Sequence, residues 1–322
     1  MCIIVTIVFI LVAYVISRFN ENNYSTFQSH IMNALAINET LSSHRYLNMG
    51  ISLEGDHDCN LINRSLCSTT KKSLVVSFWR ESSRDKWLAK NILKLFAEDH
   101  FTRIIMVHDN SSWLSFPNRE RLIWIHANAQ KRFWYLKRFL TPPVLKSYNY
   151  IWVLDDDVEL LFDPLHYEYV IAQLDISLSS PGRAKGNISH PITRVNKDFV
   201  SKIGRWTDFV EIGPIFVASS TAWECLWHYM SPFVGLGWGF DLVWCKLLAH
   251  KCSLNTTIEQ SCAVLDIFIS NHLSEYISSI AAGSQELPAY KSYYSNFHTK
   301  KNNIGPLVHN LKIYFSYNKT RQ

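Results

Sequence analysis

The sequence predicts an α/β fold, in which one domain is built on an open, mostly parallel, Rossmann-like sheet with helices on both faces. Three observations predict it. From residue 73 onward, apolar runs of strand length alternate with amphipathic segments of helix length. The run at 150–154 is continuously apolar, as strands covered on both faces are. Polar residues follow several of these runs, at the strand ends where such sheets bind ligands.

The first half of the domain alternates strands with helices. Its strand segments are rich in β-branched and aromatic residues, as in "SLVVSFW". Its helix segments repeat apolar residues every three or four positions, and Pro142 and Pro143 interrupt the second helix. In chain order we expect a strand at 73–79, a helix at 84–100, strands at 102–109 and 121–127, a helix at 130–140 and a strand at 150–154.

The second half continues this pattern around two irregular segments. A polar, basic insert covers 181–206, and a glycine-rich turn covers 235–241. In chain order we expect a helix at 164–174, strands at 176–180 and 209–218, helices at 220–230 and 242–250, and a strand at 263–272.

Composition and charge limit the kinds of function. Of the 322 residues, 48% are hydrophobic and 18% are charged, which is typical of a globular protein. The net charge of +5 is spread along the chain without a basic block. We therefore expect no nucleic-acid partner, whereas a small anionic ligand suits this charge.

The first seventeen residues, "MCIIVTIVFILVAYVIS", are nearly all apolar. Residues 1–17 predict either a signal anchor that tethers the protein to a membrane or a signal peptide whose cleavage yields a secreted protein. Residues 18–72 are polar and weakly periodic, which is typical of a stem or linker. The domain itself then extends over 73–322.

Sequons and cysteines agree with a secretory route. Cys59 with Cys67, and Cys252 with Cys262, are close enough in sequence to bridge short loops, although the sequence leaves other pairings open. We expect a type II protein of the Golgi or endoplasmic reticulum membrane, with its domain in the lumen. Seven Asn-X-Ser/Thr sequons support this, at Asn23, Asn38, Asn63, Asn110, Asn187, Asn255 and Asn318.

Three successive aspartates, Asp155, Asp156 and Asp157, end the fourth strand. Alternation along an extended chain sends the outer two side chains to one side, where they can share one divalent cation. Carboxylate oxygens suit Mn²⁺ or Mg²⁺, and Asp156 would then contact the ribose of a nucleotide or a backbone amide. Without an ion the outer carboxylates repel each other, so removing one should not lower the melting temperature of the metal-free protein much. The alternative is an acidic turn in which each aspartate caps a backbone amide.

A hydrophobic strand followed by Asp-x-Asp resembles the metal motif of GT-A-type glycosyltransferases. The chain resembles more closely domain-of-unknown-function family 707, which belongs to the same fold clan. Leu154 and Asp156 stand where the family motif has an aromatic residue and a glutamate, so both outer ligands are kept. The segments that carry the resemblance are "KRFWYLKRFLTPPVLKSYNYIWVLDDDVEL", "FDPLHYEYVIAQLDISLSSP", "FVEIGPIFVASSTAWECLW" and "GLGWGFDLVWCKLL".

The resemblance implies a GT-A-like catalytic domain at 73–322 that binds a nucleotide-sugar donor and an unknown glycan, lipid or protein acceptor. Asp155, Asp157 and His272, which closes the last strand, would hold the metal. His272 can equally be an ordinary hydrogen-bonded histidine. Asp241, after a Gly-Trp-Gly turn, resembles the catalytic base of such enzymes, and its alternative is a helix N-cap.

Four further residues are expected to contact the donor. Ser77 and Asp109 follow or end neighbouring strands, Lys131 starts a helix beside the sheet edge, and Asp156 lies between the two metal ligands. Basic residues of the insert, such as Arg194 and Lys197, and Lys137 can meet phosphate or be solvated. Trp238 can stack on a sugar or belong to the core.

Two other functions fit parts of the same pattern. A non-catalytic, lectin-like or scaffold relative would keep the fold without metal-dependent nucleotide binding. A metal-dependent phosphoesterase would use the same aspartates, with Asp109 and Asp266 as further carboxylates.

The secretory prediction has a direct test. Enzymatic deglycosylation of the protein expressed in a glycosylation-competent host should increase its gel mobility, because sequons exposed in the lumen receive glycans. Unchanged mobility would contradict the expected topology.

Overall fold

The fold was analysed in a computed structural model of the chain. The structure describes residues 71–83, 93–186, 190–196, 203–231, 235–252, 254, 260–273 and 313–315. All of them except Lys71 belong to one compact unit, which begins at Lys72. Several predictions fall outside these residues. They concern the leader, the stem up to residue 70, the Cys59 and Cys67 pair, Lys197 and every sequon except Asn110. In the part of the chain described, no helix combines the length and the hydropathy needed to cross a bilayer.

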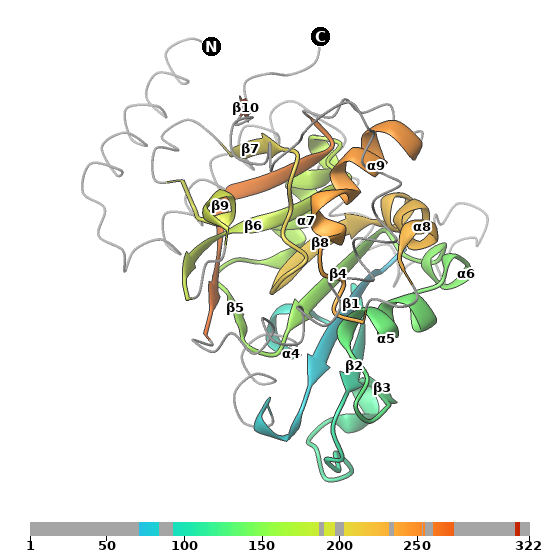
Figure 1. The fold of residues 1–322 in the computed structure, drawn as a ribbon. Coiled ribbons are helices and arrows are strands. Elements are labelled where there is room, and N and C mark those ends of the chain that lie inside the picture. The colour runs from blue at the N-terminus through green and yellow to red at the C-terminus, as the bar shows by residue number, and fades with distance from the viewer. Residues whose placement is uncertain are drawn as a thin grey trace, which may run out of the picture. The chain divides into compact units, whose positions relative to one another are not determined.

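The predicted α/β fold is confirmed. One sheet forms the centre, with the strand order β10-β7-β9-β6-β8-β4-β1-β2-β3 and with β5 paired to β9 (Figure 1). Its strands are β1 (Ser73–Trp79), β2 (Phe101–Val107), β3 (Ile123–His126), β4 (Tyr150–Asp155), β5 (Val158–Leu160), β6 (Leu178–Lys185), β7 (Gly204–Thr207), β8 (Ile215–Ser219), β9 (Cys262–His272) and β10 (Ile313–Phe315).

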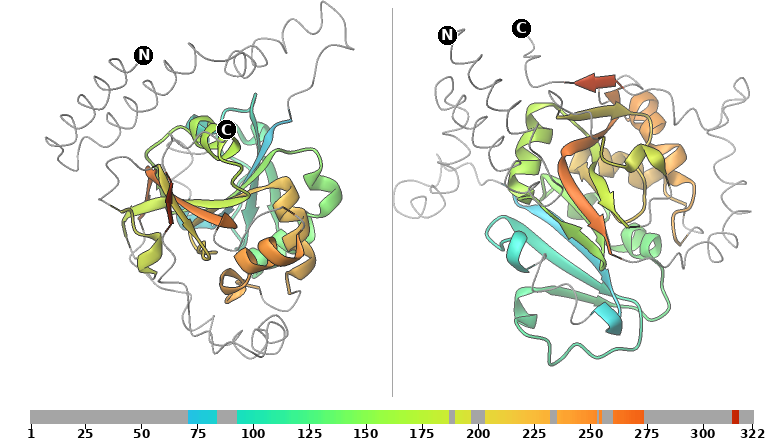
Figure 2. Two further views of the ribbon diagram at one scale, coloured as in Figure 1. Left: turned by 90° about the horizontal axis from the view of Figure 1, so that it is seen from above. Right: turned by 90° about the vertical axis from the view of Figure 1, so that its left-hand side faces the viewer.

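The helices follow the predicted order. Figure 2 shows α7 on one face of the sheet and α8 with α9 on the other. The helical elements are η2 (Glu81–Ser83), α4 (Leu93–Leu95), η4 (Arg119–Arg121), α5 (Arg132–Phe139), α6 (Pro142–Leu145), α7 (Pro164–Gln173), η5 (Pro191–Thr193), α8 (Ser220–Tyr229), η6 (Phe240–Leu242) and α9 (Trp244–Lys251). Pro142 and Pro143 start α6, because the first turn of a helix has no use for their missing N–H groups.

Parallel pairing is concentrated in the first half of the sheet. Strands β1, β2, β3 and β4 all run the same way, so their carboxyl ends meet at one edge. Strand β6 is parallel to β9, whereas β8 lies antiparallel to both β4 and β6. The carboxyl end of β4 is therefore joined to the start of β8, and Leu154 pairs with Ile215.

The predicted strand at 209–218 is wrong in its first half, because the strand begins only at Ile215. Glu211 is buried and pairs with Arg183 on β6 at 2.7 Å. The carbonyls of Ile212 and Gly213 accept hydrogen bonds from a side chain of α5, and Pro214 has no N–H to donate. The 208–214 segment therefore forms a loop at the edge where β4 ends.

The two faces of the central strands are packed separately. Leu74, Val76, Ile151, Val153 and Phe216 belong to a core that α5, α6, α8 and α9 complete. On the opposite face, the Trp152 ring lies among those of Phe96, Phe162 and Tyr167. Both faces are covered, which explains why β4 has no alternating pattern.

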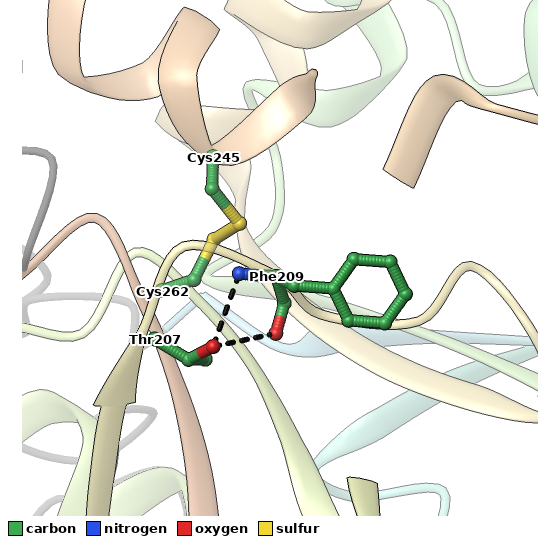
Figure 3. The surroundings of a disulfide bond; sticks show 4 residues. All are labelled: Thr207, Phe209, Cys245 and Cys262. Carbon is green, nitrogen blue, oxygen red and sulfur yellow. Dashed lines mark hydrogen bonds between the residues drawn. A yellow bond between two sulfur atoms is a disulfide. The ribbon is translucent and has the colours of Figure 1, made fainter. Parts of the chain in front are cut away.

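The disulfides differ from the close pairing that the sequence suggests. Cys225 of α8 bonds Cys252 at the end of α9, and Cys245 of α9 bonds Cys262 at the start of β9. Cys252 and Cys262 therefore do not pair. Figure 3 shows the second disulfide beside β7, where the Thr207 hydroxyl bonds the backbone of Phe209. Helix α9 is thus fixed both to α8 and to the sheet.

Candidate active site

Each of the three aspartates at the end of β4 has a partner of its own. Asp155 ends β4, and Asp156 and Asp157 form the turn that leads to β5. The partners are Arg132 for Asp155, Ser83 and Arg80 for Asp156, and His272 for Asp157. Removing an outer carboxylate would relieve repulsion but would also take a partner from Arg132 or from His272.

The pairing of β5 with β9 brings Asp157 to His272. Val158 lies opposite His272 in the ladder, and the N–H of Leu273 donates to the Asp157 carbonyl at 2.7 Å. Nε2 of His272 then lies 3.1 Å from Oδ1 of Asp157. Burial alone would raise the pKa of Asp157, but the His272 imidazole and the Arg132 charge outweigh burial and lower it.

A glycine leaves the space in which the His272 backbone lies. Gly186 follows β6 with a φ of +94°, and a side chain there would collide with the His272 carbonyl. Both the conformation and the close approach require glycine. The end of β6 thereby fixes the end of β9.

The arrangement fits a divalent cation. Ligand atoms of Asp155, Asp157 and His272 lie within 4.8 Å of one another. Nδ1 of His272 is buried and has no hydrogen-bond partner among the described residues, whereas Oδ1 of Asp157 faces Nε2 of the same imidazole. Buried polar atoms normally have partners, and a bound cation would provide one. Two carboxylates and an imidazole suit Mn²⁺ or Mg²⁺, with carboxylates the preferred ligands.

Asp156 faces the ends of β1 and β2 instead. Its carboxylate accepts a hydrogen bond from the Ser83 hydroxyl, and Nε of Arg80 lies 3.9 Å away. Burial raises the pKa of Asp156, and the hydrogen bond from Ser83 opposes this rise. Burial also lowers the pKa of His108, against the negative charges of Asp109 and Asp156. These residues form a polar group beside the candidate metal ligands.

Asp109 organises the loop after β2. Its carboxylate accepts hydrogen bonds from the Glu81 amide at 2.7 Å and from both the amide and the hydroxyl of Ser111. Burial would raise the pKa of Asp109, but these hydrogen bonds lower it. Asp109 lies at the carboxyl edge of the sheet, as predicted. Both of its carboxylate oxygens accept hydrogen bonds from backbone amides, those of Glu81 and Ser111.

One predicted donor contact needs revision. Ser77 is wholly buried within β1, and its hydroxyl accepts from the Trp79 indole at 2.9 Å, so it has no surface to offer a nucleotide. Lys131 is the N-cap of α5, and the next residue, Arg132, pairs with Asp155.

Arg132 connects three parts of the site. One guanidinium nitrogen donates to the Ile212 and Gly213 carbonyls, each at 2.6 Å, and another pairs with Asp155. The guanidinium also lies 5.5 Å from the centre of the Phe78 ring. Burial lowers the pKa of Arg132 to about 10, so it stays charged at neutral pH.

Asp241 is buried beside the same loop. One of its carboxylate oxygens faces the Ile212 N–H at 3.4 Å. Burial, together with the negative charge of Glu211, raises the pKa of Asp241 to about 7. The N-cap alternative is wrong, because α9 begins at Trp244 after Val243 and Asp241 lies within η6. A carboxyl group with a pKa near neutrality suits acid–base catalysis.

Arg132 and Glu211 were not found by sequence reasoning, although each leaves a signal. A cation in the first turn of a helix opposes the helix dipole, so Arg132 needs a nearby anion. Glu211 is a lone acid within the apolar run "FVEIGPIF", and a buried acid needs a cation such as Arg183.

The other residues predicted to contact phosphate or sugar lie in different parts of the domain. Lys137 lies over the Trp227 ring on α8 at 3.7 Å, away from the sheet edge. The Arg194 carbonyl accepts from Arg205 in the buried network around Asp266. Trp238 is half-buried in the glycine-rich turn.

A family model matches residues 58–287, and its description is "Protein of unknown function (DUF707)". The chain belongs to this family. The match includes every residue of the site described above. No curated protein matches the DUF707 chain.

Several solved structures resemble the DUF707 chain at low identity. S. aureus TarS 1–349 in complex with UDP is 12% identical with a TM-score of 0.38, and the match covers 63% of this chain and 60% of that one. The complex of TarS 1–349 with UDP-GlcNAc is 11% identical with a TM-score of 0.41, covering 70% and 67%. A mycobacterial protein is 9% identical with a TM-score of 0.43, covering 69% and 74%. Because these TM-scores lie below 0.5, we take the function from the chain's own residues.

The site predicts how metal affinity responds to substitution. Asp157→Asn and His272→Ala should each weaken Mn²⁺ binding roughly 10- to 100-fold, as loss of a group at a metal site commonly does. Isothermal titration calorimetry with Mn²⁺ measures this directly. Asp156→Asn is the matched control and should bind Mn²⁺ like the parent. Equal affinity in all four proteins would remove His272 and Asp157 from the metal site.

Proposed function

We propose that this protein is a metal-dependent glycosyltransferase that moves a sugar from a nucleotide-diphosphate donor to an acceptor hydroxyl in the secretory pathway. The observation that carries the proposal is the convergence of Asp155, Asp157 and His272 at the carboxyl edge of the sheet, joined through Arg132 to the loop that faces Asp241.

Asp155, Asp157 and His272 would hold Mn²⁺ or Mg²⁺. When bound, the cation supplies positive charge that stabilises the departing diphosphate. Three protein ligands leave coordination positions for diphosphate oxygens. Arg132 adds a fixed positive charge beside Asp155.

The nucleoside would lie over the ends of β1 and β2. Asp156 faces this side together with Arg80 and Ser83, and half-buried His108 follows β2. A carboxylate can accept hydrogen bonds from ribose hydroxyls, and the guanidinium and imidazole can contact the base or the phosphates. Asp109 supports this side by holding the loop.

Asp241 would act as the base of an inverting transfer. It takes the proton from the acceptor hydroxyl, whose oxygen forms a bond to the anomeric carbon of the sugar. The bond between that carbon and the diphosphate oxygen breaks, and its electron pair leaves with the nucleoside diphosphate. A base whose pKa lies near the working pH is efficient in such a step.

The site favours transfer over two-metal phosphate hydrolysis. That chemistry needs further converging carboxylates. Asp266 is buried against Arg205 and bonds the Asn196 amide, and both Asp109 oxygens hold backbone. Within the described residues, a single group of three metal-binding side chains converges.

Two disulfides support the secretory part of the proposal, because such bonds persist in oxidising compartments. The membrane tether through residues 1–17 remains part of the same proposal.

Binding of UDP tests the proposed function. UDP should raise the melting temperature in the presence of Mn²⁺ and have much less effect with EDTA, because a ligand that binds only the folded state stabilises it. Asp155→Asn and Asp157→Asn should lose this response. A non-catalytic relative would show no Mn²⁺-dependent shift with any nucleotide diphosphate or UDP-sugar, and that result would contradict the proposal.

The pH dependence tests the base. Below about pH 7 Asp241 is protonated and cannot accept a proton, so release of UDP from UDP-sugars should rise with pH and level off above 7. Asp241→Asn should lower the rate roughly 10²- to 10⁴-fold and abolish this rise.

The same substitution should not weaken the fold. Because the folded protein raises the pKa of Asp241, ionisation at pH 8 destabilises it, and an asparagine avoids that cost. Asp241→Asn should thus melt at or above the parent temperature at pH 8. Asp175→Asn, at an exposed turn, is the control for rate. Parent-like rates in Asp241→Asn would exclude the base.

A further inference from the structure

The first turn of α5 touches three segments of the site that are distant in sequence. Arg132 pairs with Asp155 on β4 and donates to the Ile212 and Gly213 carbonyls of the 208–214 loop. The next residue, Phe133, donates its N–H to the Gly235 carbonyl at 2.6 Å. The start of α5 thus meets the strand that ends in the metal ligands and both loops around Asp241.

Residue 212 forms the connection between Arg132 and Asp241. Its carbonyl accepts from Arg132 at 2.6 Å, and its N–H faces the Asp241 carboxylate at 3.4 Å. The loop is held on its other side as well, because the Asp155 N–H donates to the Pro214 carbonyl at 2.8 Å. A displacement of Ile212 would therefore change the positions of both Asp155 and Asp241.

The glycine-rich turn is fitted to the same helix. Gly237 has a φ of +80°, and a side chain there would press on the Phe133 ring. Phe133 also packs edge-to-face on Phe240, the residue before Asp241, with ring centres 6.2 Å apart. The first turn of α5 thus contacts both loops that surround Asp241.

We propose that Arg132 is a positioning residue, which sets the spacing between the metal ligand Asp155 and the base Asp241 through the Ile212–Gly213 backbone. This inference rests on the proposed function and adds to it a requirement for the guanidinium shape. A guanidinium offers five N–H donors in a fixed plane and can hold a carboxylate and two carbonyls at once. An ammonium group keeps the charge but cannot hold all three in that geometry.

Correct spacing matters because transfer needs the donor and the acceptor hydroxyl in line. A misplacement of about 1 Å can cost roughly 100-fold in rate. If Arg132 contributed only its charge, replacing it with lysine would leave the rate unchanged.

The test is Arg132→Lys in the full-length protein. We expect Mn²⁺ and UDP affinities within about threefold of the parent, because every metal ligand is kept and a positive charge remains. We expect the rate of UDP release from UDP-sugars to fall roughly 100-fold. The pH at which this rate rises should also move, because Asp241 loses the fixed Ile212 amide.

The contact between Arg132 and the 208–214 loop can also be tested without measuring turnover. Amide hydrogen exchange followed by mass spectrometry should show the 208–214 segment exchanging about tenfold faster in Arg132→Lys than in the parent. The matched control is Arg138→Lys, on the exposed side of α5, where the guanidinium lies over Trp134 at 4.7 Å. It should resemble the parent in exchange, binding and rate.

The outcomes separate this inference from the function on which it rests. Parent-like exchange in Arg132→Lys overturns the positioning role, whether or not turnover is detected. Parent-like rates with an unchanged pH profile do the same. Loss of Mn²⁺ binding in Arg132→Lys would place Arg132 in the metal site itself and also overturn the proposal. Failure of the parent to bind UDP with Mn²⁺ would instead contradict the glycosyltransferase function.

Discussion

The antiparallel pairing of β5 with the end of β9 is the contact on which the site depends. Strand β4 delivers three aspartates to the edge of the sheet, where the chain would otherwise leave for solvent. The short reversal into β5 returns it to the sheet and sets Val158 opposite His272. Only then do carboxylates from one end of the domain and an imidazole from the other face a common point. Gly186 completes this arrangement by letting the end of β6 approach the His272 backbone.

Charge balance within the site is achieved locally. Three adjacent carboxylates are costly unless each is neutralised, and the chain provides a guanidinium, a hydroxyl with a second guanidinium, and an imidazole. The buried acids Glu211 and Asp241 lie just beyond. Glu211 is paired with Arg183. Burial and the negative charge of Glu211 raise the pKa of Asp241.

Much of the fold could be predicted because its elements are encoded locally. The strands at 73–79 and 150–154 and the helices α5, α7 and α8 follow from short-range patterns of apolar residues. The strand β5 could not be predicted, because three residues carry no periodicity and its pairing depends on β9. Residues 209–214 were predicted as strand because they are mostly apolar, and the pairing of Glu211 with Arg183 could not be read from the sequence. The disulfide pairing failed for the same reason: closeness in sequence does not imply closeness in space.

The candidate site shows the same division. Asp155 and Asp157 were predicted from their position after a strand, and His272 and Asp241 from the resemblance to glycosyltransferases. The structure brings Asp155, Asp157 and His272 together. Arg132 was missed in favour of its neighbour Lys131, because helix phase decides which side chain faces the edge. Ser77 was predicted to contact the donor at the end of a strand, but it lies inside β1, two residues before the strand ends.

The disulfide between Cys245 and Cys262 has a consequence for the integrity of the chain. It spans the connection from α9 to β9, so a single peptide-bond break between residues 252 and 262 cannot release the C-terminal fragment. Strand β9, with His272, would remain covalently attached to the helix that follows Asp241. A nicked molecule would run as one species on a gel without reductant and as two species with it.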